Sequence, residues 1–289
     1  MPVIVDVLSE IAKNAAMSLP PVRAWRLRRP RAGVSYTGSI GDLDRYAFLG
    51  LDLLTARVGL LTGRSVVEFG PGDLLTSGLA MLAAGAARYA AVDRFAGDYG
   101  GPEGRKWYAA IEARWPEKYP GIPWPAWLAA EKFPHGYPDR VASLELGVER
   151  VPNIGRFDVV CSFQVGEHVS DIAAFANVTR AMMTRGGVAV HRVDFGPHGV
   201  WEKYRDPLTF LRLPDLVWRW MGSARGTPNR RRVHEFVEAF QAAGLAVELH
   251  DLEVFESART DLSKLNRRFR AMPPESLRTR TALFVCRDE

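Results

Sequence analysis

The sequence predicts an α/β protein in which a mostly parallel β-sheet carries helices on both faces. Three observations predict this fold. Short β-branched and aromatic runs recur along the chain, apolar helical patterns lie between them, and glycines break the chain where one pattern gives way to the next. Strands that alternate with helices in this way need crossover connections, and such connections make neighbouring strands parallel.

The first 62 residues form a predicted helical extension, which we expect to act as a lid on a domain spanning residues 63–289. Apolar residues recur at helical spacing in residues 3–17 and again in residues 43–62. Between these patterns, the arginine-rich stretch 23–31 favours an exposed linker. Its charge also leaves open a peripheral contact with a membrane surface or with an anionic substrate.

The strands and helices of the domain follow in alternation. Strand patterns cover residues 66–69, 89–92, 157–163, 188–193, 245–255 and 283–286, and helical patterns cover residues 74–84, 172–184 and 233–243. Two insertions, at about 95–140 and 195–232, are far longer than the usual connections of about 2 to 6 residues. They contain seven of the eight tryptophans, which we expect to pack the insertions onto the core or to line a pocket.

Composition excludes several classes of protein. Hydrophobic residues make up 47% of the chain and charged residues 25%, which excludes a disordered chain. The two cysteines, Cys161 and Cys286, lie in apolar runs, so we expect reduced core residues and a cytoplasmic location. No apolar stretch is long enough for a transmembrane segment, and the first residues lack the features of a signal peptide. The net charge of +5 is mild, so nucleic acid is not the expected partner.

A glycine-rich loop follows the first predicted strand. Gly70, Pro71 and Gly72 separate this strand from an apolar helix, which places the loop at the carboxyl end of a parallel sheet. Glycines let the backbone approach a ligand closely, and the free N–H groups of the helix start favour a carboxylate. Asp93 ends the next strand and could accept hydrogen bonds from both ribose hydroxyls. These features predict a nucleoside-bearing ligand.

A dinucleotide fits this loop poorly. The dinucleotide fingerprint needs a glycine where the chain has Leu75, and Glu68 would repel a pyrophosphate. Glu68 suits a ligand with an ammonium group instead. A nucleoside with an amino-acid tail, S-adenosylmethionine, fits all of these positions.

The chain resembles the class I S-adenosylmethionine-dependent methyltransferases from about residue 65 to residue 287. Residues 67–72 are similar to the first motif of that family, residues 91–94 to the second, and residues 157–169 to the fourth. The resemblance implies a three-layer, doubly wound sheet of seven strands with the last strand reversed. Residues 147–152 align best with the third motif. The cofactor-binding residues implied in this way are Glu68, Gly70, Pro71, Gly72, Asp93, Arg94, Val148, Glu149, Gln164 and Val165.

Three residues are candidates for catalysis. His168 follows the fourth predicted strand and resembles the Glu-His pair of many small-molecule methyltransferases, although it could simply cap the next helix. His191 and Asp194 lie on the following strand, three residues apart, so that their side chains point to opposite faces unless a bulge intervenes. His198, Glu202 and Tyr204 are more typical of ordinary loop residues. The spacing of His191, Asp194 and His198 does not predict a metal site, because no rigid helix sets its geometry.

The predicted reaction is methyl transfer from S-adenosylmethionine to a hydroxyl group of a small molecule or saccharide, by in-line displacement. Because the donated methyl group is already activated, the enzyme mainly aligns the reactants, and a general base assists a hydroxyl acceptor. Two alternatives stay open: a methyltransferase that acts on RNA or protein, and a non-catalytic binding module with the same fold. The sequence indicates no oligomeric state.

Overall fold

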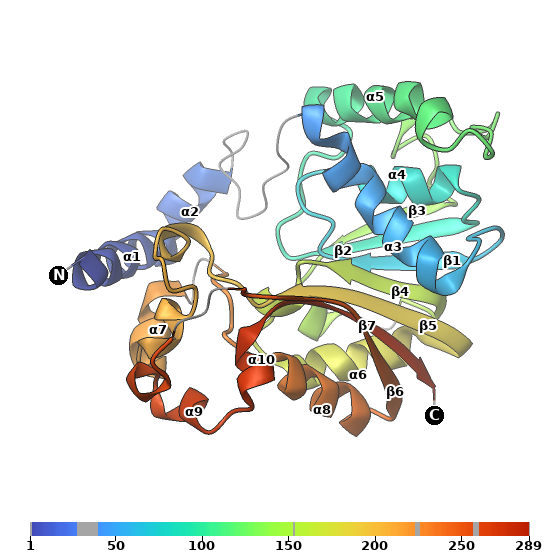
Figure 1. Cartoon of the computed structure of the whole chain (residues 1–289). Helices are drawn as coiled ribbons and strands as arrows, with labels where there is room; N and C mark the ends of the chain where they lie inside the picture. The colour runs from blue at the N-terminus through green and yellow to red at the C-terminus, as the bar shows by residue number, and fades with distance from the viewer. Residues whose placement is uncertain (1, 28–39, 153, 223–225, 257–259, 289) are drawn as a thin grey trace.

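The computed structural model describes residues 2–27, 40–152, 154–222, 226–256 and 260–288 (Figure 1). A seven-stranded sheet forms its centre. The strands are β1 (Ser65–Phe69), β2 (Arg88–Asp93), β3 (Val141–Glu145), β4 (Phe157–Phe163), β5 (Met183–Asp194), β6 (Leu245–Val254) and β7 (Thr279–Asp288). Their order in the sheet is β3-β2-β1-β4-β5-β7-β6, and β7 runs in the direction opposite to its two neighbours, β5 and β6. The predicted mostly parallel sheet with a reversed last strand is therefore confirmed.

The strand order reverses beside β1, and this reversal positions the site. The chain runs outward from β1 through β2 to β3, and then crosses back to place β4 on the other side of β1. Crossovers that leave in opposite directions open a crevice at the carboxyl ends of the central strands, where ligands bind in open α/β sheets.

Helices cover both faces of the sheet (Figure 1). The helices are α1 (Pro2–Ser18), α2 (Pro20–Leu27), α3 (Leu49–Val58), α4 (Thr76–Ala83), α5 (Pro102–Lys118), α6 (Ile172–Met182), α7 (Asp215–Gly222), α8 (Val233–Ala242), α9 (Arg267–Arg270) and α10 (Pro274–Arg278). Helices α3, α4 and α5 lie on one face, and α6 and α8 lie on the other. This arrangement confirms the predicted three layers.

The first face shows why the chain needs small residues where helix and sheet meet. All eight residues of α4 are buried. Gly78 in this helix faces the Tyr89 ring of β2 so closely that a Cβ atom there would lie 2.4 Å from the ring. Helix α3 packs into the same core through Leu51 and Leu54. This part of the predicted N-terminal extension therefore shares its hydrophobic core with the sheet.

The second insertion forms a separate apolar cluster beside the sheet. Trp201 and Trp218 are buried there together with Phe210 and Phe269. Helix α1 packs against α7 at the edge of this cluster, and the Asn14 side-chain amide donates a 2.9 Å hydrogen bond to the Trp220 carbonyl. In this cluster, packing rather than lining a pocket accounts for the two buried tryptophans.

Several boundaries differ from the predicted ones. The sequence pattern gave no strand for β3, whose side chains are only partly buried or exposed. Strand β5 begins at Met183 rather than at residue 188, and helix α6 ends at Met182. No described helix combines the length and the apolar character that crossing a membrane requires. Residues 28–31 of the arginine-rich stretch, and the side chains of Arg23 and Arg26, lie outside the description.

Candidate functional site

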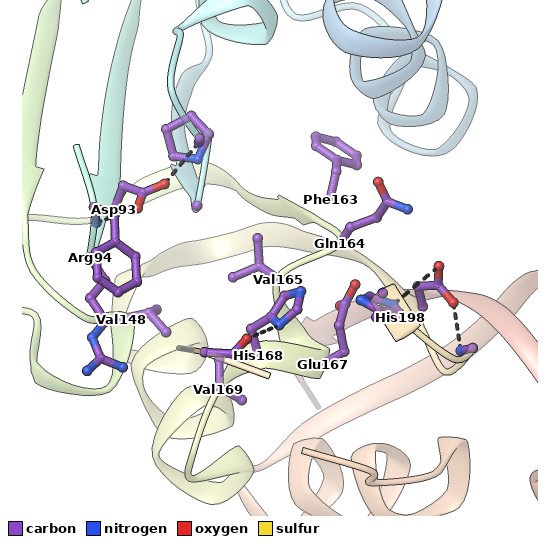
Figure 2. Close-up of a pocket in the computed structure, with 18 of the residues that line it drawn as sticks. Asp93, Arg94, Val148, Phe163, Gln164, Val165, Glu167, His168, Val169 and His198 are labelled. Atoms are coloured by element: carbon purple, nitrogen blue, oxygen red, sulfur yellow. Dashed lines mark hydrogen bonds and ion pairs between the residues drawn. The ribbon is translucent and has the colours of Figure 1, made fainter. Parts of the chain in front are cut away.

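A large cavity lies over the carboxyl ends of the central strands. Its volume is about 900 Å³, and its walls come from the loops after β1, β2, β4 and β5 (Figure 2). The cavity therefore opens at the point where the strand order reverses. It is large enough for a nucleoside ligand and a second small molecule, since ligand cavities span about 300–1,000 Å³.

The glycine loop forms one wall, and its conformation depends on glycine. Gly70 and Gly72 have φ angles of +66° and +86°, a region that side chains rarely adopt. A Cβ atom on Gly70 would also lie 2.4 Å from a methyl group of Val165, on the loop after β4. The two loops thus pack directly against each other. Gly70, Pro71, Gly72 and Val165, which are predicted to bind the cofactor, all line the cavity.

Asp93 holds the glycine loop to the end of β2. The backbone N–H of Gly72 donates to one carboxylate oxygen at 2.9 Å, and the N–H of Phe95 donates to the other at 2.7 Å. Burial raises the pKa of Asp93 despite these hydrogen bonds. A carboxylate has about four acceptor positions, so two of them are not used by these N–H groups. Asp93 lines the cavity and can receive a pair of ligand hydroxyls.

Glu68 does not line the cavity, which differs from its predicted role beside an ammonium group. It is 3% exposed, and one carboxylate oxygen accepts 2.6 Å hydrogen bonds from the hydroxyls of Ser77 and Tyr89. Burial raises the pKa of Glu68 to about 7. Glu68 therefore joins β1 to α4 and β2 beneath the loop, and a direct contact with a ligand is not supported. The sequence showed the charge of Glu68 but not the direction in which its side chain points.

The remaining predicted cofactor residues, Arg94, Val148, Glu149 and Gln164, also line the cavity. Glu149 accepts a 2.7 Å hydrogen bond from the backbone N–H of Ser170, which fixes its carboxylate at the rim. Gln164 adopts a φ of +60°, which is uncommon for a residue other than glycine. Such strain often occurs at functional sites, where it directs the chain around a ligand.

His168 lies in the short 3-10 helix Gly166–His168 after β4 and lines the cavity. Its Nδ1 is 2.7 Å from the carbonyl oxygen of Gly226. A carbonyl only accepts, so Nδ1 carries the proton and Nε2 has the free lone pair. Enclosure by protein and the nearby His198 lower the pKa of His168. The ring is still exposed to solvent through the cavity. The pKa of His168 is therefore lowered in full only when a bound ligand displaces the water around the ring.

The structure places His191 in the core, which corrects its predicted catalytic role. Its ring is fully buried and stacks between Phe69 and Phe240, with centroid distances of 6.2 Å and 5.4 Å. Nδ1 lies 2.8 Å from the Ser162 hydroxyl, and Nε2 lies 3.2 Å from the Thr179 hydroxyl. Both ring nitrogens are therefore occupied away from the cavity. Burial lowers the pKa of His191 to about 3, which keeps the ring neutral.

Asp194, at the end of β5, also lines the cavity. One carboxylate oxygen accepts a 2.7 Å hydrogen bond from the Gly196 N–H, and the other is 3.7 Å from Nε2 of His198. This pairing lowers the pKa of Asp194 and raises the pKa of His198, in spite of the burial of both side chains. Asp194 therefore orients a second histidine toward the cavity.

Two residues of this cluster, His198 and Glu167, were not among the predicted site residues. The His198 ring lies 5.4 Å from the His168 ring. Glu167 is 2% exposed and lies between the two rings, and neither carboxylate oxygen has a hydrogen-bond partner among the described residues (Figure 2). Burial raises its pKa to about 8. The Glu-His pair in the sequence was the available signal for Glu167, whereas nothing in the sequence placed His198 beside His168.

The outer wall of the cavity comes from both ends of the chain. Arg45 and Tyr46 line it from the segment before α3, and Phe255 and Arg280 line it from the ends of β6 and β7. The Thr76 hydroxyl donates a 2.6 Å hydrogen bond to the Tyr46 carbonyl, which fixes this segment on α4. Within the described ranges, no group of three or more ligating side chains is arranged to hold a metal ion.

Comparisons with solved structures find chains of similar fold. An S-adenosylmethionine-dependent methyltransferase from Mesorhizobium loti is 16% identical (TM-score 0.43, covering 85% of this chain and 99% of that one). Phosphoethanolamine N-methyltransferase 2 of Haemonchus contortus is 12% identical (0.47, 83% and 52%). An O-methyltransferase family protein from Burkholderia thailandensis is 13% identical (0.45, 86% and 58%).

A search of curated sequences finds no match. A family model described as a methyltransferase domain, however, matches residues 43–250, which is more than two thirds of the chain. The match includes α3, the glycine loop, Asp93 and both cavity histidines. The chain belongs to this methyltransferase family, as its resemblance to the class I S-adenosylmethionine-dependent enzymes predicted.

Proposed function

We propose that the protein transfers the methyl group of S-adenosylmethionine to a hydroxyl group of a small molecule or saccharide. The observation that carries this proposal is the continuity of the cavity. One space runs from the glycine loop and Asp93 to the histidines after β4 and β5. A donor held at the first end would present its methyl group to an acceptor held at the second.

The residues at the first end fit the donor. Asp93 keeps acceptor positions for two ribose hydroxyls, and the closely approaching backbone of Gly70 and Gly72 leaves room for the amino-acid tail. Val148 and Arg94 line the wall beside them, where an adenine ring would pack. When bound, S-adenosylmethionine supplies a methyl group on a positively charged sulfur, which needs no further activation.

His168 is the proposed general base. Its proton is on Nδ1, held by the Gly226 carbonyl, so Nε2 can take the proton of an acceptor hydroxyl as the oxygen attacks the methyl carbon. The lowered pKa keeps this nitrogen unprotonated near neutral pH. A general base of this kind contributes about 10²–10⁴-fold to the rate. A carboxylate acceptor would need no base, so the histidine favours a hydroxyl.

A two-step experiment tests this proposal. Calorimetry first measures whether the purified protein binds S-adenosylmethionine. The protein is then incubated with methyl-labelled S-adenosylmethionine and with matched panels of hydroxyl, amine and carboxylate compounds, including free monosaccharides. We expect saturable binding and label in the hydroxyl panel. Absence of binding by a folded protein would leave the non-catalytic alternative, and label confined to amines or carboxylates would contradict O-methylation.

A further inference from the structure

The two cavity histidines present open nitrogen atoms to the same space. His168 uses Nδ1 for the Gly226 carbonyl, which leaves Nε2 open. His198 has Nε2 buried and facing Asp194, whereas its Nδ1 has no hydrogen-bond partner among the described residues and is not buried. Their ring centroids lie 5.4 Å apart. One ligand with two adjacent oxygen atoms could therefore contact both rings.

The surroundings of the two rings differ in charge. His198 has the Asp194 carboxylate at 3.7 Å on one side and Glu167 on another. His168 has a neutral carbonyl as its partner. The Asp194 carboxylate stabilises a protonated imidazole at His198, whereas enclosure by protein and the neighbouring His198 favour a neutral ring at His168, in spite of its carbonyl partner. Neighbouring groups that are pushed toward opposite protonation states are typical of an acid and a base in one site.

The carboxyl group of Glu167 makes no hydrogen bond with the described residues. Both of its oxygens are buried and unpartnered, and a buried polar group without a partner costs stability. The N–H groups of Glu167 itself and of Asp194 lie nearby and moderate its pKa, but neither has the geometry of a hydrogen bond. When this carboxyl group is ionised, its charge raises the pKa of His198, which gives it a role within the cluster.

We propose that His198 is a second functional residue: a protonated imidazole, held by Asp194 and Glu167, that binds an oxygen atom of the acceptor next to the hydroxyl that is methylated. His198 donates a hydrogen bond from Nδ1 to this second oxygen, while His168 Nε2 accepts the proton of the reacting hydroxyl. The substrate class is then a compound with two adjacent oxygen atoms, such as a 1,2-diol. This inference rests on the proposed O-methylation and narrows it.

The charged groups around His198 determine how it titrates. Asp194 faces it from β5, Glu167 and His168 from the turn after β4, and Glu202 from its own loop. Arg280 on β7 acts through Asp194. The carboxyl groups outweigh both burial and the positive charges, so that the pKa of His198 is raised while that of His168 is lowered.

Titration of histidine-labelled protein by NMR tests the protonation states, with signals assigned from His168→Gln and His198→Gln. We expect His198 to titrate at a higher pH than His168, and Glu167→Gln to lower the pKa of His198. Glu149→Gln is the matched control, because Glu149 lines the same cavity but is bonded to Ser170. Equal titration of the two rings, or a His198 pKa unmoved by Glu167→Gln, would overturn the proposal.

Probe binding tests the substrate class. Millimolar catechol and phenol are added separately to the protein in complex with S-adenosylhomocysteine, and the His198 signal is followed. We expect catechol to shift this signal several-fold more than phenol, and His168→Gln to reduce the difference. Equal shifts, or no shift with either probe, would overturn the inference. Label transfer to single hydroxyl compounds would still support O-methylation in that case, so the two failures are distinguishable.

Discussion

Asp93 combines two tasks in one carboxylate. It accepts the N–H groups of Gly72 and Phe95, and it keeps acceptor positions directed at the cavity. Asp93→Ala should therefore weaken S-adenosylmethionine binding by at least about 1.5–3 kcal/mol, the value of hydrogen bonds to a charged group. Calorimetry measures this loss. Glu145→Ala is the control, because Glu145 pairs with Asp93 in the sheet register but lies outside the cavity lining. Equal affinities for the two variants would contradict the placement of the ribose.

His168→Gln should reduce turnover with a hydroxyl acceptor by about 10²–10⁴-fold, because the general base is lost. Its affinity for S-adenosylmethionine should stay unchanged, since no cofactor contact is removed. Steady-state kinetics and calorimetry measure the two quantities. His250→Gln serves as the control, because His250 lies on β6 outside the cavity lining. A His168→Gln enzyme with full turnover would reduce this histidine to a structural role.

Single residues show where the sequence is informative and where it is not. Gly70, Gly72 and Asp93 lie at the carboxyl ends of strands, where the cavity opens. Their position in the cavity lining was therefore predictable. Glu68 and His191 lie within strands, where side chains point to the two helix-covered faces of the sheet rather than to its carboxyl edge, which forms the cavity. Both are held by hydroxyl partners from other elements, which only the tertiary structure brings near.

At the scale of elements, the contact between the loops after β1 and β4 shapes the cavity. Gly70→Ala would strain a left-handed backbone and push a Cβ atom into Val165. We expect a lower melting temperature and weaker S-adenosylmethionine binding than for Gly63→Ala. Gly63 has a similar φ of +74°, but its added Cβ would meet nothing within 4 Å. Thermal unfolding and calorimetry of both variants separate backbone strain, about 1–3 kcal/mol, from the loop contact. Identical behaviour would show that the loop contact is unimportant.

The elements themselves were largely predictable, with exceptions that have physical causes. Buried strands such as β1 and β4 consist mostly of β-branched and aromatic residues, which their sequences display directly. Strand β3 lies at the edge of the sheet and is half exposed, so its sequence carries no apolar pattern. The early start of β5 follows from its pairing with β4 at Met183, a tertiary contact that helical periodicity could not reveal.

At the scale of the whole molecule, stability should depend on pH through buried carboxyl groups. The pKa of Glu68 is raised from 4.5 to about 7 by burial, so the folded protein holds this proton more tightly than the unfolded chain. The resulting stabilisation is complete below pH 4.5 and is lost as the pH rises through 7. It amounts to about 3 kcal/mol, at 1.36 kcal/mol for each pH unit of difference.

Denaturant unfolding at pH 5 and pH 8 tests this dependence. Glu68→Gln keeps a neutral side chain of similar shape, so its free energy of unfolding should fall less between these pH values than that of the wild type. Glu145→Gln is the matched control, because Glu145 is exposed and should leave the wild-type slope unchanged. A Glu68→Gln slope equal to that of the wild type would mean that Glu68 is ionised in the folded state at both pH values.

A crystal structure of the complex with S-adenosylhomocysteine tests the central claim most directly, because it locates the donor and the acceptor side together. We predict ribose hydroxyls within hydrogen-bonding distance of Asp93, and a sulfur atom that faces the space between His168 and His198. A ligand bound away from Asp93, or a sulfur atom separated from both histidines by packed side chains, would contradict the proposed methyl transfer.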